Sequence, residues 1–205
     1  MDKVGKFTAY HGTKSCFTES ILKNNFVIKK PKKKDNHWLG HGVYFFDEYE
    51  LAHWWAETKT AVQNKKYSRD DKACVIEAEI LYGKSIDLDT IKGRNSFFSF
   101  WKQYEKEIVK KGIVLDFSMG DEDDRIIQER KRCFALDCFK KEKKIDVLIY
   151  TFTRKDPVYE KSKYNLKVAS DLGLEYKEKQ ICVSDPARIM NRKDVTYNDY
   201  QEVII

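Results

Sequence analysis

The fold is decided by residues 38–45, which read WLGHGVYF. The glycines loosen the backbone just before the run from Val43 to Phe46, whose β-branched and aromatic side chains predict a short strand. Glycines beside aromatic side chains also form a slot that fits a planar ring. Taken alone, the segment is equally typical of a turn that leads into a core strand.

A second informative segment lies upstream, where residues 7–13 read FTAYHGT. The pattern predicts a strand that ends near Gly12. His11 then lies at a strand end, from which its side chain projects toward a cleft. Gly12 allows a ligand to approach the backbone closely because it carries no Cβ. A single histidine in such a string is more often structural, so its meaning depends on the segment at 38–45.

The remaining periodicity predicts a single α+β domain over residues 1–205, because strands and helices do not strictly alternate and no composition break divides the chain. A helix is expected over residues 15–24 with Ser15 as its cap, and another after Asp47, with Leu51, Trp54 and Trp55 on one face. Two more helices are expected at 97–109 and 126–139. Further strands are expected at 74–81, 146–152, 180–184 and 194–205.

Composition restricts the class of protein. The chain has 205 residues and 39 Lys and Arg against 33 Asp and Glu, a net charge of +6 that permits binding to a polyanion without requiring it. The five cysteines are scattered and form no C-x-x-C pair, so we expect small core residues in a reducing cytoplasm rather than disulfides or zinc ligands. No apolar run approaches the roughly 18 residues of a membrane span, and the first residues do not read as a secretory signal.

The order of these segments carries more information than any one of them. HGT at 11–13, WLGHGVYF at 38–45, a helix with Ala52 and Trp55, and a late strand KQICVSD at 179–185 occur in sequence. This order resembles the diphtheria-toxin-like ADP-ribosyltransferases, the family that includes the poly-ADP-ribose polymerases. The resemblance covers residues 7–56 and, less fully, 178–186. Residues 83–145 match no part of it and are expected to form a helical insert.

The resemblance implies a fold and an NAD site. The fold would be two packed, mostly antiparallel β-sheets with flanking helices and NAD in the cleft between the sheets. His11 would hold the adenosine ribose, the backbone of Gly12 would pair with the nicotinamide carboxamide, and two aromatic rings would stack on the nicotinamide. The cofactor-binding residues that it implies are His11, Gly12, Thr13, Gly42, Tyr44 and Trp55.

The chain departs from the family pattern at two positions. Ala52 stands where the polymerases have a serine that bonds the carboxamide. Gln180 stands where they have the catalytic glutamate. A glutamine can hydrogen-bond the reacting ribose but places no negative charge near an oxocarbenium-like transition state. Chain elongation is therefore expected to be lost, which leaves transfer of a single ADP-ribose.

Glu178 is a second candidate for the chemistry. Residues i and i+2 of a strand share a face, so Glu178 can accompany Gln180 and act as a general base toward the acceptor. The alternative is a solvated charge in a charged stretch. The predicted catalytic residues are His11, Tyr44, Glu178 and Gln180.

Charged loops suggest partners without defining them. The lysine-rich residues 29–34 would meet the diphosphate of NAD or a nucleic-acid acceptor, or would simply be solvated. Residues 172–179 are the candidate segment for recognising the acceptor, and the acidic residues 121–124 suit a helix start. His37, His41 and His53 lack the spacing of metal ligands, so no metal is expected.

The function implied by the resemblance is mono-ADP-ribosylation of a macromolecule with NAD as co-substrate. RNA or DNA is slightly favoured over protein as the acceptor. A compact transferase with glutamine in the third position resembles the toxin of a toxin–antitoxin or phage-defence system, which implies an antitoxin partner.

Three alternatives stay open. An inactive module would only hold NAD or ADP-ribose. An RNA 2′-phosphotransferase on the same fold would need basic residues converging on a phosphate, for which only Lys32 and His41 are candidates. A plain nucleic-acid-binding protein would show steep salt dependence and no need for NAD.

Overall fold

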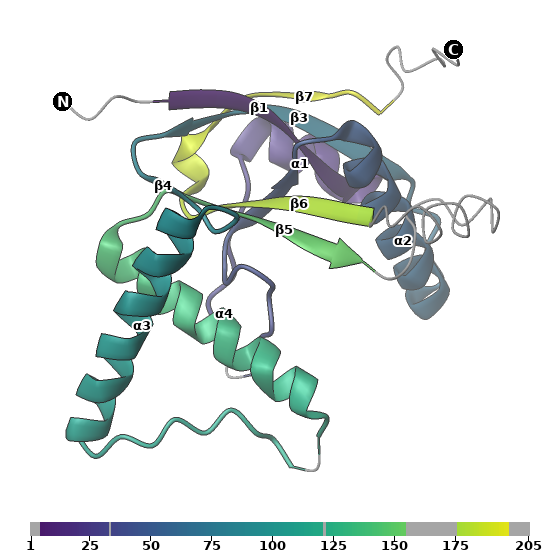
Figure 1. Cartoon of the computed structure of the whole chain (residues 1–205). Coiled ribbons are helices and arrows are strands. Elements are labelled where there is room, and N and C mark those ends of the chain that lie inside the picture. Colours follow the sequence, from purple (N-terminus) through teal and green to yellow (C-terminus); the bar gives the residue numbers. More distant parts are fainter. Residues whose placement is uncertain (1–4, 33, 121, 155–175, 197–205) are drawn as a thin grey trace, which may run out of the picture.

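The computed structural model describes residues 5–32, 34–120, 122–154 and 176–196. Its helices are α1 (Ser15–Asn24), α2 (Tyr49–Tyr67), α3 (Ile91–Lys110) and α4 (Asp124–Lys143), with a short 3₁₀ turn η1 (Pro186–Arg188). Its strands are β1 (Gly5–Lys14), β2 (Val43–Phe46), β3 (Ala73–Tyr82), β4 (Ser85–Asp87), β5 (Val147–Arg154), β6 (Tyr176–Val183) and β7 (Ile189–Asp194) (Figure 1). The predicted α+β class is confirmed.

The described strands form one seven-stranded sheet in the order β4-β5-β6-β2-β1-β3-β7. Every neighbouring pair is antiparallel except β4 and β5, which are parallel. The expectation of two separate packed sheets is therefore wrong. The two halves of the sheet meet at β1 and β2, which pair at a single position, Tyr10 with Phe46.

The weak seam between β1 and β2 has a local cause. The carbonyl of Tyr44 in β2 accepts a hydrogen bond from the ring of His11 at 2.7 Å. A side chain thus takes the place that a backbone donor of β1 would occupy in a regular ladder. β1 instead pairs along its whole length with β3, from Gly5 opposite Tyr82 to Lys14 opposite Ala73. Among the described strands the sheet stays continuous, but backbone pairing between its two halves is limited to Tyr10 and Phe46.

Helices cover both faces of the sheet, as the alternation of side chains in β2 requires. Phe45 packs in one core cluster with Ile21 of α1. Tyr44 and Phe46 point to the opposite face, where Tyr44 packs near residues of α4 and Phe46 packs against Leu51 of α2. The opposite face therefore carries α2 toward one end and α4 toward the other.

Several predicted boundaries need correction. Lys14, not Ser15, precedes the first turn of α1, and the Ser15 hydroxyl accepts a bond from the Lys72 amide instead. α2 follows Glu48 rather than Asp47 and has no side-chain cap. The last described strand is β7, before the expected range 194–205, of which residues 197–205 lie outside the described part of the chain.

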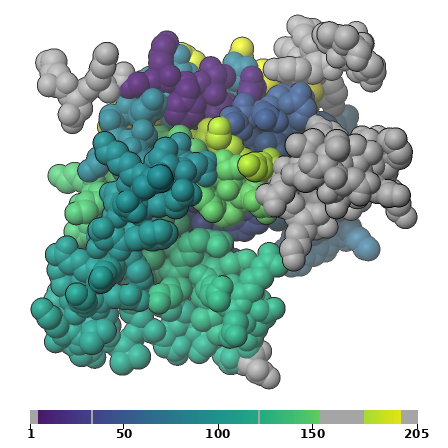
Figure 2. Space-filling model, viewed as in Figure 1, coloured from purple at the N-terminus to yellow at the C-terminus, as the bar shows by residue number. Residues whose placement is uncertain are grey.

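Residues 83–145 contain β4, α3 and α4, so this segment is not wholly helical. β4 extends the sheet at its edge, while α3 and α4 run away from it as a lobe that is prominent in the space-filling view (Figures 1 and 2). The expected acidic start of α4 is confirmed, because the Asp123 carboxylate accepts a bond from the Arg125 amide. None of the described helices combines the length and apolarity needed to cross a bilayer.

Candidate functional site

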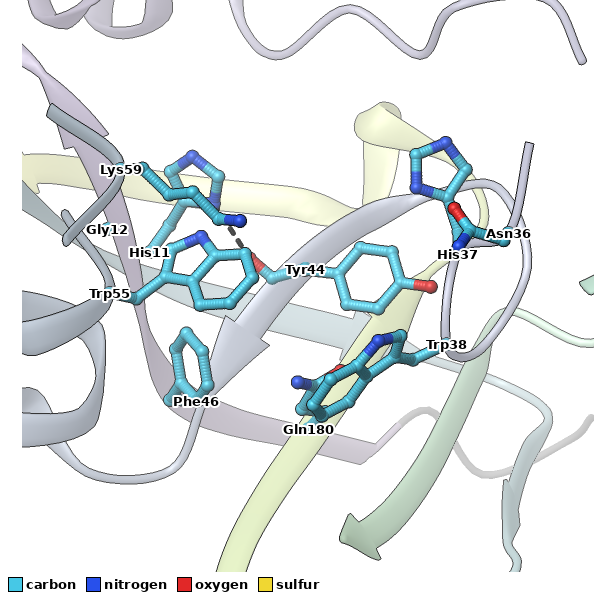
Figure 3. Close-up of a pocket in the computed structure, with 10 residues that line it drawn as sticks. All are labelled: His11, Gly12, Asn36, His37, Trp38, Tyr44, Phe46, Trp55, Lys59 and Gln180. Carbon is cyan, nitrogen blue, oxygen red and sulfur yellow. Dashed lines mark hydrogen bonds between the residues drawn. The ribbon is translucent and has the colours of Figure 1, made fainter. Parts of the chain in front are cut away.

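Four of the six predicted cofactor-binding residues, His11, Gly12, Tyr44 and Trp55, line one cavity together with Gln180. It has a volume of about 440 Å³ and lies beside the seam between β1 and β2 (Figure 3). Residues from β1, β2, β6, α2 and the loop before β2 line it: His11, Gly12, Asn36, His37, Trp38, Tyr44, Phe46, Trp55, Lys59 and Gln180. Five of the residues predicted from sequence are therefore brought together by the fold, although they span 170 positions of the chain (180 − 11 + 1).

His11 offers a hydrogen-bond acceptor to the cavity. A carbonyl oxygen can only accept, so the bond to Tyr44 O places the ring proton on Nδ1. Burial lowers the pKa of His11 below its usual 6.5, and the bond to Tyr44 opposes this shift only in part. The ring is therefore neutral at pH 7, and its Nε2 has a free lone pair suited to a hydroxyl donor.

Tyr44 contributes an aromatic ring whose orientation is fixed. Its hydroxyl donates to Gly40 O at 2.6 Å and accepts from the Leu39 amide at 2.7 Å. Burial raises the pKa of this phenol well above 10, so the hydroxyl is neutral and fully used by the loop. What Tyr44 presents to the cavity is its ring, which makes it suited to stacking.

Trp55 lies on the α2 side of the cavity, at 6.2 Å from Phe46 between ring centroids. The ammonium of Lys59 lies 4.3 Å from the Trp55 ring centroid, a cation–π distance. Lys59 itself is exposed, so it can leave the ring when a ligand enters. The cavity thus has aromatic side chains on its β2 side and on its α2 side. The ammonium of Lys59 lies beside the Trp55 ring.

Gly12 allows α2 to pack directly on β1. A Cβ at Gly12 would lie 2.1 Å from the carbonyl oxygen of Ala52 and 3.0 Å from the amide of Ala56. Ala52 is fully buried in this contact. Ala52, which stands where the polymerases have a serine, therefore lies in a tight contact between α2 and β1. It is not among the residues that line the cavity.

Gln180 and Glu178 form a buried polar pair on β6. Gln180 Nε2 donates to Glu178 Oε1 at 2.5 Å, and both side chains are almost completely buried. Gln180 Oε1 is buried with no hydrogen-bond partner in the part of the chain that the structure describes. An unsatisfied buried acceptor costs about 1–3 kcal/mol. In a residue that lines the cavity, such an atom points to a ligand that donates a hydrogen bond.

Other predicted residues lie near the cavity without lining it. Thr13 is buried in β1, and Gly42 packs against β6, where a Cβ would lie 2.5 Å from Cys182 Sγ. Glu178 is buried and does not line the cavity, but it accepts a hydrogen bond from Gln180, which does. Lys29, Lys30, Lys32 and Lys34 are exposed and absent from the lining, and residues 33 and 172–175 lie outside the described part.

Some lining residues carry no predicted role. Lys59 follows Trp55 by one helical turn, so the i, i+4 spacing on α2 was the signal that could have indicated it. Asn36, His37 and Trp38 come from an irregular loop, whose path no periodicity describes. Contrary to the expectation that His37 and His41 have no ligand geometry, their donor atoms and one of Asp35 lie within 4.8 Å of one another.

The arrangement suits a ligand that has a flat ring and hydroxyl donors. Aromatic rings of Tyr44, Phe46 and Trp55 offer stacking surfaces. His11 and Gln180 add two neutral acceptors, each suited to a hydroxyl donor. Apolar walls with a few convergent polar atoms are typical of small-molecule sites.

Comparison with known proteins adds one relative. An uncharacterized protein of Methanocaldococcus jannaschii is 31% identical over 99 residues, which is 47% of this chain and 44% of that protein. The chain thus spans less than half the length of that relative. No family model and no solved structure matches.

Proposed function

We propose that the chain cleaves NAD at the nicotinamide glycosidic bond and transfers a single ADP-ribose to a macromolecular acceptor. The observation that carries the proposal is the side chain of Gln180. Its buried oxygen has no hydrogen-bond partner among the described residues, and Gln180 lines a cavity together with His11, Tyr44 and Trp55. His11 and Tyr44 are positions at which the sequence resembles the ADP-ribosyltransferases, and Gln180 stands where that family has its catalytic glutamate.

Each side chain would have a distinct role. Tyr44 and Trp55 would hold the nicotinamide ring, and His11 Nε2 would accept a bond from the adenosine ribose. Gln180 Oε1 would accept a bond from a hydroxyl of the nicotinamide ribose. Held in this way, the substrate loses the freedom that slows the reaction in water.

The reaction breaks the bond between ribose C1′ and the nicotinamide nitrogen. Nicotinamide leaves with the bonding electron pair, and a nucleophilic atom of the acceptor forms the new bond to C1′. The proton of that nucleophile passes to solvent, because Glu178 is buried and is not among the residues that line the cavity. Glu178 instead orients Gln180 through their hydrogen bond.

The biological setting is also a proposal. We propose a toxin of a toxin–antitoxin or phage-defence system in the cytoplasm, with an antitoxin as partner and RNA or DNA favoured over protein as acceptor. The net charge of +6 supports a polyanionic acceptor. Against the 2′-phosphotransferase alternative, neither Lys32 nor His41 lines the cavity of Gln180.

The test is transfer of label from NAD carrying a labelled adenylate to separate pools of protein, RNA and DNA. Wild type should label one pool and release an equal amount of nicotinamide. Tyr44→Ala and Gln180→Ala should each reduce both products at least tenfold, while Tyr44→Phe, which keeps the ring, should retain most of the activity. A matched control is Tyr104→Ala on α3, which is not among the residues of the cavity.

Two results would reject this proposal. If no pool gains label and no nicotinamide appears, the chain is not a transferase, and binding of NAD without turnover would identify an inactive module. If Tyr44→Ala keeps full activity, the reaction takes place somewhere other than this cavity.

A further inference from the structure

A second cluster of chemically capable side chains lies where the loop before β2 meets α4. Asp35, His37 and His41 each place one donor atom within 4.8 Å of the others. Asp35 and His41 also line a separate cavity of about 500 Å³. Two imidazoles and one carboxylate form a donor set that zinc accepts.

His41 is oriented by Asp137 of α4. The Asp137 carboxylate accepts a bond from His41 Nδ1 at 2.6 Å and another from the His41 backbone amide at 2.7 Å. Lys140 lies 3.2 Å from the same carboxylate and balances its charge. The Nδ1 proton is thereby fixed toward Asp137. A carboxylate that holds one ring nitrogen while the other binds metal is the usual support of a zinc-ligating histidine.

The other ring nitrogen of His41 faces Asp35. Nε2 lies 2.9 Å from Asp35 Oδ2. These two atoms lie close enough together for one cation to bind both. Zinc bonds of about 2.0–2.2 Å to both atoms require only a slight widening of the pair.

His37 supplies the third donor. Its ring centroid is 4.8 Å from that of His41, and no hydrogen bond reaches its ring nitrogens among the described residues. Because His37 is exposed, the cluster leaves room for solvent as a fourth ligand.

Cys133 does not belong to this donor set. Its sulfur lies 4.0 Å from Nδ1 of His41, the nitrogen already bonded to Asp137. Burial, followed by the charge of Asp137, raises the pKa of Cys133 to about 12, so the sulfur is a thiol and not the thiolate that metals prefer.

We propose that Asp35, His37 and His41 bind a zinc ion, with Asp137 positioning His41. This proposal is independent of NAD chemistry. It has a structural consequence for the first cavity, because Asn36, His37 and Trp38 form part of its wall. An ion bound at Asp35 and His41 would hold this wall in place.

The test is calorimetric titration of zinc chloride into the chelator-treated full chain. We expect one zinc ion per chain, and binding weaker by at least about tenfold in Asp35→Asn, His37→Ala and Asp137→Asn. Replacement of zinc by Co²⁺ should give the visible absorption of a site with nitrogen and oxygen ligands, and His37→Ala should remove it. His37 is exposed, so this variant should keep the circular dichroism spectrum of wild type.

His53→Ala is the matched control, since His53 lies on α2 beside Glu57 at 3.7 Å and belongs to neither cluster. It should bind zinc as wild type does. Absence of saturable binding in wild type would overturn the proposal. Unchanged affinity in His37→Ala would overturn it as well.

Discussion

The residue that most shapes the candidate site is Gln180, and its environment explains why a glutamine suits this position. Its amide nitrogen donates to Glu178 at 2.5 Å inside the protein. A carboxylate at 180 would face a second carboxylate at that distance. The Glu178–Gln180 pair is therefore a coherent arrangement, in which the amide nitrogen of Gln180 is bound by Glu178 and its oxygen is a buried acceptor in a residue that lines the cavity.

We predict that Gln180→Glu destabilises the protein increasingly as pH rises. Two carboxylates that share a buried site raise one pKa above the unfolded value of about 4.3. A raised folded-state pKa preserves stability at low pH and loses it as pH rises through that pKa. Thermal unfolding followed from acid to neutral pH checks this prediction. Gln103→Glu on α3 is the control, since Gln103 also bonds a glutamate but is exposed. Parallel pH profiles for the two variants would contradict it.

We predict that His11 makes the wild type lose stability as pH falls below 6.5. Its folded-state pKa is lowered by burial, so the unfolded chain takes up the proton first. Chemical denaturation at about pH 7.5 and about pH 5.5, on either side of the ordinary histidine pKa, measures the effect. The drop should be smaller in His11→Asn and unchanged in His53→Asn. If His11→Asn retains the full drop, His11 is not its source.

At the scale of elements, the site depends on how β1, β2 and α2 meet. β2 touches β1 at one pair of residues, and the His11 side chain bridges the strands beside it. α2 lies on β1 without a side chain between them at Gly12. A displacement of α2 would therefore move Trp55 relative to Tyr44 and change the width of the cavity.

We predict that Gly12→Ala costs about 1–3 kcal/mol of unfolding free energy, because its Cβ would overlap the backbone of Ala52 and force α2 away. Urea denaturation measures this loss. Gly83→Ala is the control, since its Cβ would meet only the Asp146 side chain, at 3.3 Å. Equal stability of Gly12→Ala and wild type would show that α2 does not rest on β1 as described.

Much of the secondary structure and of the candidate site could be predicted from sequence, and the features that were missed have physical reasons. The alternation of Val75, Glu77 and Glu79 against Ile76, Ala78 and Ile80 predicted β3, and the order of motifs brought His11 and Gln180 into one site. The single sheet was missed because strand order depends on long-range pairing. β4 was missed because three residues carry little periodicity. The loop before β2 was expected, but its path could not be predicted because contacts of His41 and Trp38 with α4 set it.

For the molecule as a whole, the excess of positive charge favours one class of acceptor, the nucleic acids. Lys29, Lys30, Lys32 and Lys34 are exposed, and the chain carries a net charge of +6. We predict that transfer to nucleic acid falls steeply with salt, because contacts between lysine and phosphate release counterions. Release of nicotinamide without acceptor should change little. Label transfer and nicotinamide release, measured together across a salt series, check this. A salt-independent transfer rate would favour a protein acceptor.

Equilibrium titration of NAD measures whether the cavity between β2 and α2 holds this dinucleotide. Stacking on one aromatic ring contributes about 1–3 kcal/mol. We predict saturable binding of one NAD per chain in wild type, and affinity about tenfold weaker or worse in Trp55→Ala. Trp101→Ala on α3, which is not among the residues of the cavity, should bind as wild type does. No saturable binding of NAD, or equal affinity in Trp55→Ala and wild type, would contradict it.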